Sequence, residues 1–359
     1  MKNRRLLIFV GVLLVFALII RIYSSSSIRV ENGYSTGIYP PVAAFLRHLL
    51  GWLPFSFGDI LYGTFVAWLL WKLFKRIRAL FRKQVTKQNF VRGCLKTLAV
   101  FLAIYVFFNA LWGINYNRKG IADQLQLKME KYTLDDLKNI NNMLLAKVNE
   151  SKQALVNVHY EYPSSKQLFV KVQQAYAEVD SLYPFLQYHT LSLKPSIWSW
   201  LGNYTGFTGY YNPFTGEAQV NTSVPKFIQP FTSCHEVAHQ LGYAKEMEAN
   251  FVGYLAASSS KDTLLRYSVY LDLFLYSNRN LYSSDSSAAK SFAKQLLPVV
   301  KDDMKELRDF YLRHKNPVEP LIRWIYGKYL QSNEQPQGVL SYDEVTSFLI
   351  AYYKKFGKI

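Results

Sequence analysis

Three apolar segments limit the folds open to this chain, because each is close to the length that a helix needs to cross a lipid bilayer. They cover residues 6–23, 55–74 and 97–112. A helix crosses about 30 Å of hydrocarbon in about 20 residues, so each segment predicts a transmembrane helix. The first segment also fits the apolar core of a secretory signal peptide. No small-x-small cleavage site precedes the serine run after it, so we expect an uncleaved anchor.

The charge distribution separates the membrane part of the chain from the rest. Residues 1–119 contain 17 Lys and Arg and two acidic residues, whereas the remainder contains 25 basic and 23 acidic residues. Of the net charge of +17, +15 therefore lies in the membrane-proximal region, residues 1–119. A nucleic-acid-binding domain would instead carry its basic residues as a patch on the domain itself. We expect contact with the lipid bilayer and no nucleic-acid partner.

Basic residues also predict the orientation of the chain. Residues 72–96 contain nine Lys and Arg and no acidic residue, which the positive-inside rule places in a cytoplasmic loop. The sequence therefore predicts a membrane region over residues 1–115 and an extracytoplasmic domain over residues 116–359. Between the first two spans, the apolar residues 39–53 are bounded by prolines and predict a short helix lying in the outer membrane interface.

The motif HEVAH at residues 235–239 is the main indication of chemistry. On a helix, His235 and His239 project from one face, where both imidazoles can bind one Zn²⁺. Glu236 lies one step round the helix, where its carboxylate can take a proton from an attacking water without being a metal ligand. The alternative is a helix with two solvent-facing histidines. The motif predicts a zinc hydrolase site.

A third ligand is expected after Gly242, which is placed to end the first helix in the left-handed conformation. Glu246 and Glu248 both follow this turn, but they face opposite sides of a second helix. Asn250 lies four residues after Glu246 on the same face, where it can hydrogen-bond a ligating histidine. We predict that Glu246 is the ligand, that Asn250 supports the site, and that Glu248 points into solvent or an ion pair. Two histidines and one glutamate leave the open position of a catalytic site with one Zn²⁺.

The patterns after residue 116 predict a mostly helical domain with one β-hairpin, formed by residues 207–211 and 217–221. The hairpin precedes the metal helix, expected at residues 224–241, and its edge is placed to pair with a substrate backbone. The alternative is an ordinary surface hairpin. Cys94 and Cys234 lie in different regions and are not expected to pair. Further helices are expected at residues 133–157, 165–186, 246–257, 262–276, 288–314, 320–331 and 342–356.

HEVAH followed by EMEAN at residues 246–250 resembles the gluzincin metallopeptidases, in which HExxH is joined by a glutamate in an E-x-x-x-D motif. EMEAN is most similar to the E-x-E-A-D segment of membrane-bound prenyl-protein-type zinc peptidases. The resemblance makes Glu246 the ligand and Asn250 the counterpart of the family's aspartate. Asn in place of Asp and the short gap between His239 and Glu246 depart from the pattern.

The resemblance implies a mainly α protein, with transmembrane helices followed by a gluzincin-like zinc-peptidase domain. A gluzincin also needs a Tyr or His that stabilises the oxyanion of the tetrahedral intermediate. The tyrosines placed to do so are Tyr210 and Tyr211 on the hairpin and Tyr342 near the C-terminus.

Nearly the whole chain is similar to an uncharacterised family of Gram-negative bacterial membrane proteins with an HExxH motif. The similarity rests on the three apolar segments, on residues 204–225 before the motif and on SYDEV at residues 341–345. It implies an inner-membrane protein with its catalytic domain in the periplasm. We therefore expect a membrane-anchored zinc metallopeptidase acting on envelope proteins or peptides. The alternatives are a non-catalytic envelope assembly or scaffold protein with a structural metal or none, and a zinc amidase acting on a cell-wall bond.

Overall fold

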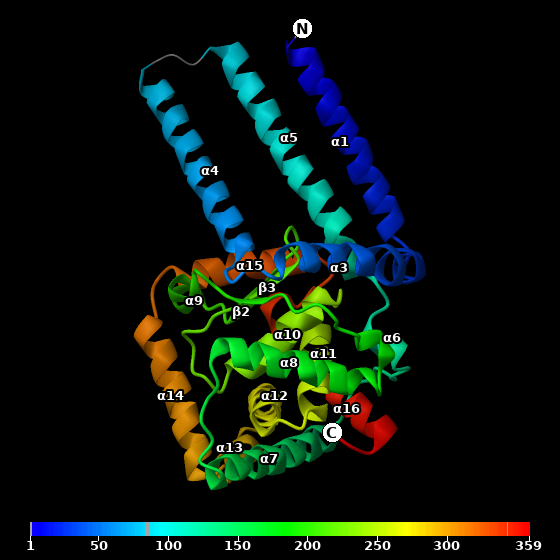
Figure 1. The fold of residues 1–359 in the computed structure, drawn as a ribbon, viewed down its shortest axis with the longest axis vertical. Coiled ribbons are helices and arrows are strands. Elements are labelled where there is room, and N and C mark those ends of the chain that lie inside the picture. Colours follow the sequence, from blue (N-terminus) through cyan, green and yellow to red (C-terminus); the bar gives the residue numbers. More distant parts are fainter. Residues whose placement is uncertain (1, 83–85, 343) are drawn as a thin grey trace.

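The computed structural model describes residues 2–82, 86–342 and 344–359. Three long helices project side by side from one end of the molecule, and the folded body lies at their other end (Figure 1). These helices are α1 (Lys2–Ser24), α4 (Phe57–Phe81) and α5 (Lys87–Leu111). Each contains a segment long and apolar enough to cross a membrane.

The predicted bounds of the basic loop, residues 72–96, are wrong, because α4 continues to Phe81 and α5 already begins at Lys87. Most of its basic residues are therefore helical. Lys, Arg and Leu have high helix propensity, so the polar ends of the two helices continue past the apolar segments. The start of α1, the end of α4 and the start of α5 lie at the same end of the molecule (Figure 1).

Three consecutive helical segments connect α1 to α4: α2 (Ser27–Arg29), the π-helix η1 (Val30–Ile38) and α3 (Tyr39–Leu50). Helix α3 lies across the base of the long helices (Figure 1). Two prolines occupy its first turn, where a missing backbone N–H leaves no hydrogen bond unmade. Phe45 and Leu49 are exposed, whereas Tyr39 and Arg47 are buried against the body. The predicted short helix is present and ends at Leu50.

The body is mainly helical, as predicted, and its helices pack around one large apolar core. Helix α7 begins with a capping box between Thr133 and Asp136, as the sequence indicates. The core includes Leu144, Val172 and Phe274, all fully buried. Its first helical elements are η2 (Gly113–Asn117), α6 (Ile121–Gln124), α7 (Leu134–Asn157), α8 (Ser165–Asp180), η3 (Pro184–Leu186) and α9 (Ser199–Thr205). The later ones are α10 (Gln229–Gln240), α11 (Glu246–Ser259), α12 (Thr263–Ser284), α13 (Ser286–Lys294), α14 (Pro298–His314), α15 (Glu319–Ser332), η4 (Gly338–Tyr342) and α16 (Val345–Phe356).

Proline accounts for two differences from the predicted helices. The helix expected over residues 288–314 is divided into α13 and α14, because Pro298 opens a new helix and cannot continue the previous one. The metal helix, expected from residue 224, begins at Gln229 with Pro230 in its first turn.

A small sheet of three strands lies beside the metal helix, in the order β1 (Leu193–Pro195), β3 (Glu217–Val220) and β2 (Gly209–Asn212). The predicted hairpin is confirmed as the antiparallel pair β2–β3, with β2 starting two residues later than expected. The third strand, β1, is parallel to β3. It was not predicted, because three residues are too few to show an alternating pattern.

A second apolar cluster joins the membrane-proximal region to the body. It contains Val30, Tyr34 and Tyr39 from η1 and α3, and Trp112 from the end of α5. These side chains meet Ala244, which lies in the turn between α10 and α11. The membrane-proximal region therefore packs directly against the turn that follows HEVAH.

Candidate metal centre

Helices α10 and α11 form a close hairpin that carries the whole motif. After α10, Gly242 adopts the left-handed conformation with φ of 87°. Its N–H bonds to the carbonyl of His239 at 3.0 Å, and the N–H of Tyr243 bonds to that of Ala238 at 3.1 Å. These two hydrogen bonds form a Schellman motif, the helix end that Gly242 predicts. The chain reverses at once, and α11 begins at Glu246.

The turn brings His235, His239 and Glu246 together. One carboxylate oxygen of Glu246, Oε2, lies 3.2 Å from Nε2 of His235 and 3.5 Å from Nε2 of His239. All three donor atoms lie within 4.8 Å of one another. Two ligands bound at about 2.0–2.1 Å to a tetrahedral zinc ion are about 3.3 Å apart. The spacing of the carboxylate from each imidazole therefore matches a tetrahedral site.

Two carboxylate oxygens beside the histidines also indicate a site for a cation. Oε2 of Glu246 and Oε2 of Glu236 are buried, and neither accepts a hydrogen bond from the described residues. A buried carboxylate oxygen without a hydrogen bond is costly unless a positive charge is near it. Two imidazoles and one carboxylate are a common ligand set for catalytic zinc.

Neighbouring groups hold the three side chains in this arrangement. Nδ1 of His235 lies 2.7 Å from Oδ1 of Asn250, and Nδ1 of His239 lies 2.7 Å from the carbonyl oxygen of Tyr243. Because both partners are acceptors, each Nδ1 carries the proton and each Nε2 keeps its lone pair for a metal. The phenol of Tyr326, on α15, donates to Oε1 of Glu246 at 2.7 Å.

The pKa shifts of the cluster follow from burial and from the mutual charges. Burial raises the pKa of Glu246, but His239 and His235 outweigh it and lower the pKa well below its usual value. Burial lowers the pKa of His239, but Glu246 and Glu236 outweigh it and raise the pKa to about 8. Glu246 is therefore an anion that favours positive charge beside it.

Glu236 occupies a separate position from the three ligands. Burial raises the pKa of its carboxyl to about 8, and the charge on Glu246 adds to the effect, while His239 lowers the pKa. The side chain packs on Gly209, the first residue of β2: a Cβ atom there would lie 2.6 Å from Oε1 of Glu236. The absence of a side chain at this position of the strand leaves room for the carboxylate.

A cavity of about 620 Å³ opens beside these groups and is large enough for a peptide or another small ligand. His235, Glu236 and Asn250 line it from α10 and α11. Gly209 and Thr208 line it at the edge of the sheet. Helices α9, α12, α14 and α15 supply most of the remaining walls.

Of the three tyrosines predicted to stabilise an oxyanion, Tyr210 and Tyr211 lie outside the cavity. The Tyr210 hydroxyl bonds to Asp59 and Ser196, at the start of α4 and after β1. The Tyr211 hydroxyl lies 3.4 Å from that of Tyr39. Neither lines the cavity. Tyr342 ends η4, and its side chain lies outside the described residues.

Tyr326 could not be identified from sequence patterns, because it is 80 residues from Glu246 in the chain. Its only signal in the sequence is its position in an amphipathic segment, and that does not indicate which distant side chain it contacts.

The prediction that Glu248 points into solvent or an ion pair is wrong, because its side chain is buried. Its carboxylate packs on Gly120, which has φ of 82° and lies in the segment between α5 and α6. Burial raises the pKa of Glu248, while Lys245 and Arg118 lower it. This segment covers the first turn of α11 and excludes solvent from that side of the helix.

The membrane-proximal region binds the carboxyl end of the metal helix. The indole N–H of Trp112 donates to the carbonyl of His239 at 3.0 Å. The carbonyl of Gln240 accepts from the Tyr39 hydroxyl at 2.8 Å and from Arg47 at 3.1 Å. The last carbonyls of a helix have no partner within it, so these side chains complete its hydrogen bonding.

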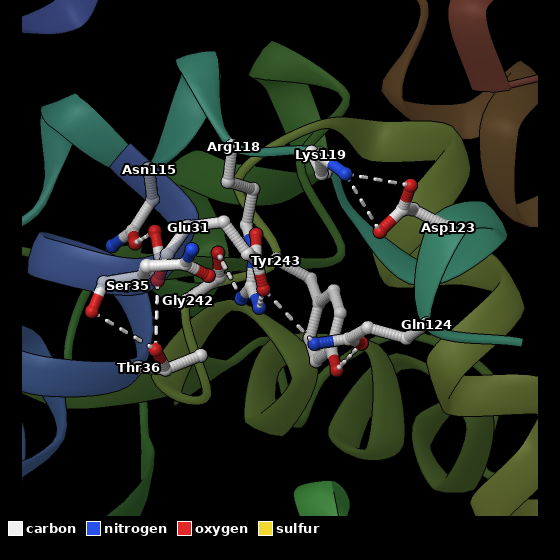
Figure 2. Close-up of polar contacts among 11 residues, drawn as sticks. Glu31, Ser35, Thr36, Asn115, Arg118, Lys119, Asp123, Gln124, Gly242 and Tyr243 are labelled. Carbon is white, nitrogen blue, oxygen red and sulfur yellow. Dashed lines mark hydrogen bonds and ion pairs between the residues drawn. The ribbon is translucent and has the colours of Figure 1, made fainter. Parts of the chain in front are cut away.

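A buried ion pair supports the turn itself (Figure 2). Arg118 binds both carboxylate oxygens of Glu31, at 3.0 and 2.7 Å, and also donates to the carbonyl of Gly242 at 3.3 Å. Its guanidinium lies 4.6 Å from the ring centroid of Tyr243. The Tyr243 hydroxyl donates to Gln124 at 2.6 Å, and Gln124 donates to Glu31 at 3.2 Å. These contacts connect η1, which carries Glu31, to Tyr243, whose carbonyl oxygen lies 2.7 Å from Nδ1 of His239.

Comparisons with known proteins identify a family for this chain. No curated protein and no solved structure is similar to the chain at a significant level. A family model described as protein of unknown function (DUF3810) matches residues 34–350, a range that holds the candidate metal centre, two of the three long apolar helices and nearly all of the body. The chain therefore belongs to the DUF3810 family of proteins of unknown function.

Proposed function

We propose that this protein is a membrane-anchored zinc metallopeptidase with a gluzincin-like site that hydrolyses peptide bonds of envelope proteins or peptides. One observation carries the proposal. The ligand atoms of His235, His239 and Glu246 lie within 4.8 Å of one another, and His235 and the buried Glu236 line a cavity of about 620 Å³. A closed structural site would instead have four protein ligands and no cavity.

The residues of the chain have separate roles in the proposed reaction. When bound, zinc polarises the scissile carbonyl and makes water a stronger nucleophile at neutral pH. Glu236 accepts a proton from the attacking water and donates it to the nitrogen of the leaving amine. Its pKa, raised to about 8 by burial, suits a group that must both take and return a proton near neutral pH. Asn250 and the carbonyl of Tyr243 hold the two imidazoles in the tautomer that leaves Nε2 free.

Strand β2 is the proposed binding edge for an extended substrate. It lies at the edge of the sheet, and its first residue, Gly209, borders the cavity and packs on Glu236. A peptide that adds to this edge would gain main-chain hydrogen bonds, which depend little on its side chains. The peptide would then pass beside the general base.

We place the protein in the inner membrane with the body in the periplasm. The basic ends of α4 and α5 lie at the same end of the molecule as the N-terminus, and the body lies at the other end (Figure 1). Positive charge marks the cytoplasmic side of a membrane protein. Alkaline phosphatase fused after Ile359 should be active in Gram-negative cells, and a fluorescent protein that folds only in the cytoplasm should be dark there. The opposite pattern would place the body in the cytoplasm.

The test of the function uses the full-length chain purified in detergent and a mixture of unmodified peptides, with the products identified by mass spectrometry. We expect cleavage that a zinc chelator abolishes and that added Zn²⁺ restores. Cleavage that is unaffected by removal of the metal would contradict a metallopeptidase. If the metal-loaded protein cuts no peptide, the result would contradict the peptidase and favour a non-catalytic role.

A further inference from the structure

We infer that helices α9 and α15 lie in the membrane interface and form a thin roof between the bilayer and the active-site cavity, so that the substrate is a polypeptide anchored in the same membrane. The substrate class rests on the proposed function, whereas the membrane contact stands on the structure of this surface.

Helix α15 has two opposite faces. Glu319, Arg323 and Tyr326 line the cavity. Exposed apolar side chains occupy the other side: Leu321, Trp324 and Ile325, with 56%, 61% and 54% of their surface accessible. With 3.6 residues per turn, these two sets lie about 180° apart on the helix. One face of α15 therefore belongs to the cavity, and the other has no partner in the described chain.

Helix α9 continues this apolar surface beside α15. Trp200, Leu201 and Tyr204 are exposed, at 59%, 42% and 45%. The same helix contributes Asn203 and Thr205 to the lining of the cavity. The roof is therefore apolar on its outer side along both helices.

Contacts with α4 and α5 place the roof helices, α9 and α15, beside the ends of the long apolar helices that meet the body. The ring of Tyr329, on α15, meets that of Phe108, near the end of α5, at a centroid distance of 6.4 Å. The indole of Trp198, directly before α9, packs on Gly63 of α4 and donates to the carbonyl of Asp59 at 3.1 Å. Both roof helices thus lie where α4 and α5 meet the body, and α15 runs across the base of the long helices (Figure 1).

A lipid bilayer is the occupant that this surface fits. If α4 and α5 cross the membrane, their ends set the depth of the interface, and the roof is continuous with it. Tryptophan and tyrosine are enriched at this depth. Amphipathic helices lie there in the membrane plane with their apolar face about 5–10 Å into the headgroup region. The exposed side chains of α9 and α15 would then be buried in lipid.

The position of the roof defines the substrate. One helix is about 10 Å thick, so the cavity lies about that far from the lipid. An extended chain covers about 3.3 Å per residue, so a scissile bond needs only a few residues between it and its anchor. We therefore expect cleavage a few residues from the membrane, in the extracytoplasmic segment of a lipid-anchored or membrane-spanning polypeptide.

The membrane contact is tested with the full-length chain in vesicles of phosphatidylethanolamine and phosphatidylglycerol. A fluorophore is attached at Ile325→Cys in a Cys94→Ser background, because the remaining Cys234 is buried. The control position is Val158→Cys, an exposed apolar residue directly after α7, and α7 lies on the side of the body far from the long helices (Figure 1). Lipids with a nitroxide on the acyl chain should quench the label at 325 several times more strongly than the label at 158. Equal quenching would overturn the membrane contact.

The substrate class is tested in the same vesicles with one peptide mixture in two forms, free or carrying an N-terminal palmitoyl chain. We expect the palmitoylated peptides to be cut at least tenfold faster, near the acylated end. The double variant Leu321→Glu/Ile325→Glu should lose this preference and still cut free peptides at the wild-type rate. Equal rates for both forms in the wild type would overturn the substrate class and leave the peptidase intact. Cleavage of neither form would contradict the peptidase itself, and the quenching result would still decide the membrane contact.

Discussion

The hydroxyl of Tyr326 donates a hydrogen bond of 2.7 Å to Oε1 of Glu246, while Oε2 of the same carboxylate faces the two histidines. The two oxygens are thus divided between a protein donor and the metal position. This bond joins α15, which covers the cavity, to the first residue of α11.

Replacement of Tyr326 by Phe should weaken zinc binding by about 10- to 100-fold, because Glu246 would lose the group that orients it. Titration against a competing chelator measures the zinc affinity of the variant and of the wild type. The control is Tyr329→Phe, one turn further along α15, whose hydroxyl contacts Tyr116 and not a ligand. Equal affinities of both variants and the wild type would show that Tyr326 does not position the carboxylate.

Substitutions of Asn250 test how the hydrogen-bond acceptor of His235 affects zinc affinity. Asn250→Leu should reduce zinc affinity by about 10- to 100-fold, since Nδ1 of His235 loses its partner at 2.7 Å. Asn250→Asp keeps an acceptor and adds a charge that makes the imidazole more basic, so we expect zinc to be held at least as tightly as in the wild type. Tighter binding by the leucine variant than by the aspartate variant would contradict this role.

The two glutamates after the turn should differ sharply. Glu246→Gln replaces a charged ligand, and we expect it to lose most of the bound zinc. Glu248→Gln should retain about one zinc per chain, because its side chain packs on Gly120 and not on the histidines. Elemental analysis of both purified variants distinguishes the two. Loss of zinc only in the Glu248 variant would mean that α11 is rotated relative to this structure.

The buried pair between Glu31 and Arg118 should stabilise the junction with the membrane region. Arg118→Ala leaves an unpaired buried carboxylate, which costs about 3–5 kcal/mol of unfolding free energy. The double variant Glu31→Ala/Arg118→Ala should lose less than the sum of the two single variants, measured by denaturant unfolding in detergent. Lys119→Ala is the matched control, since its exposed pair with Asp123 contributes at most about 1 kcal/mol. Additive losses would mean that the ion pair is not coupled across the junction.

The parts of the structure that local pattern determines could be predicted from the sequence. The apolar segments, the hairpin and the capping box of α7 are of this kind, and so is the left-handed Gly242. Each depends on residues only a few positions apart.

Distant contacts could not be predicted in this way. The bond from Tyr326 to Glu246 and the position of Gly209 against Glu236 depend on packing between elements far apart in the chain. The burial of Glu248, predicted to point into solvent or an ion pair, has the same cause, because helix periodicity shows which side chains share a face but not what covers that face. The segment that covers it, near Gly120, lies more than 100 residues earlier in the chain.

The most direct test of the central claim is the rate of peptide cleavage by zinc-loaded Glu236→Gln in comparison with the zinc-loaded wild type. Glutamine is close in size to glutamate but cannot accept the proton of the attacking water. We expect one zinc per chain in both proteins and a rate that is lower in the variant by about 10²-fold or more. A variant that holds zinc and cuts peptides at the wild-type rate would contradict the proposed catalytic role of Glu236.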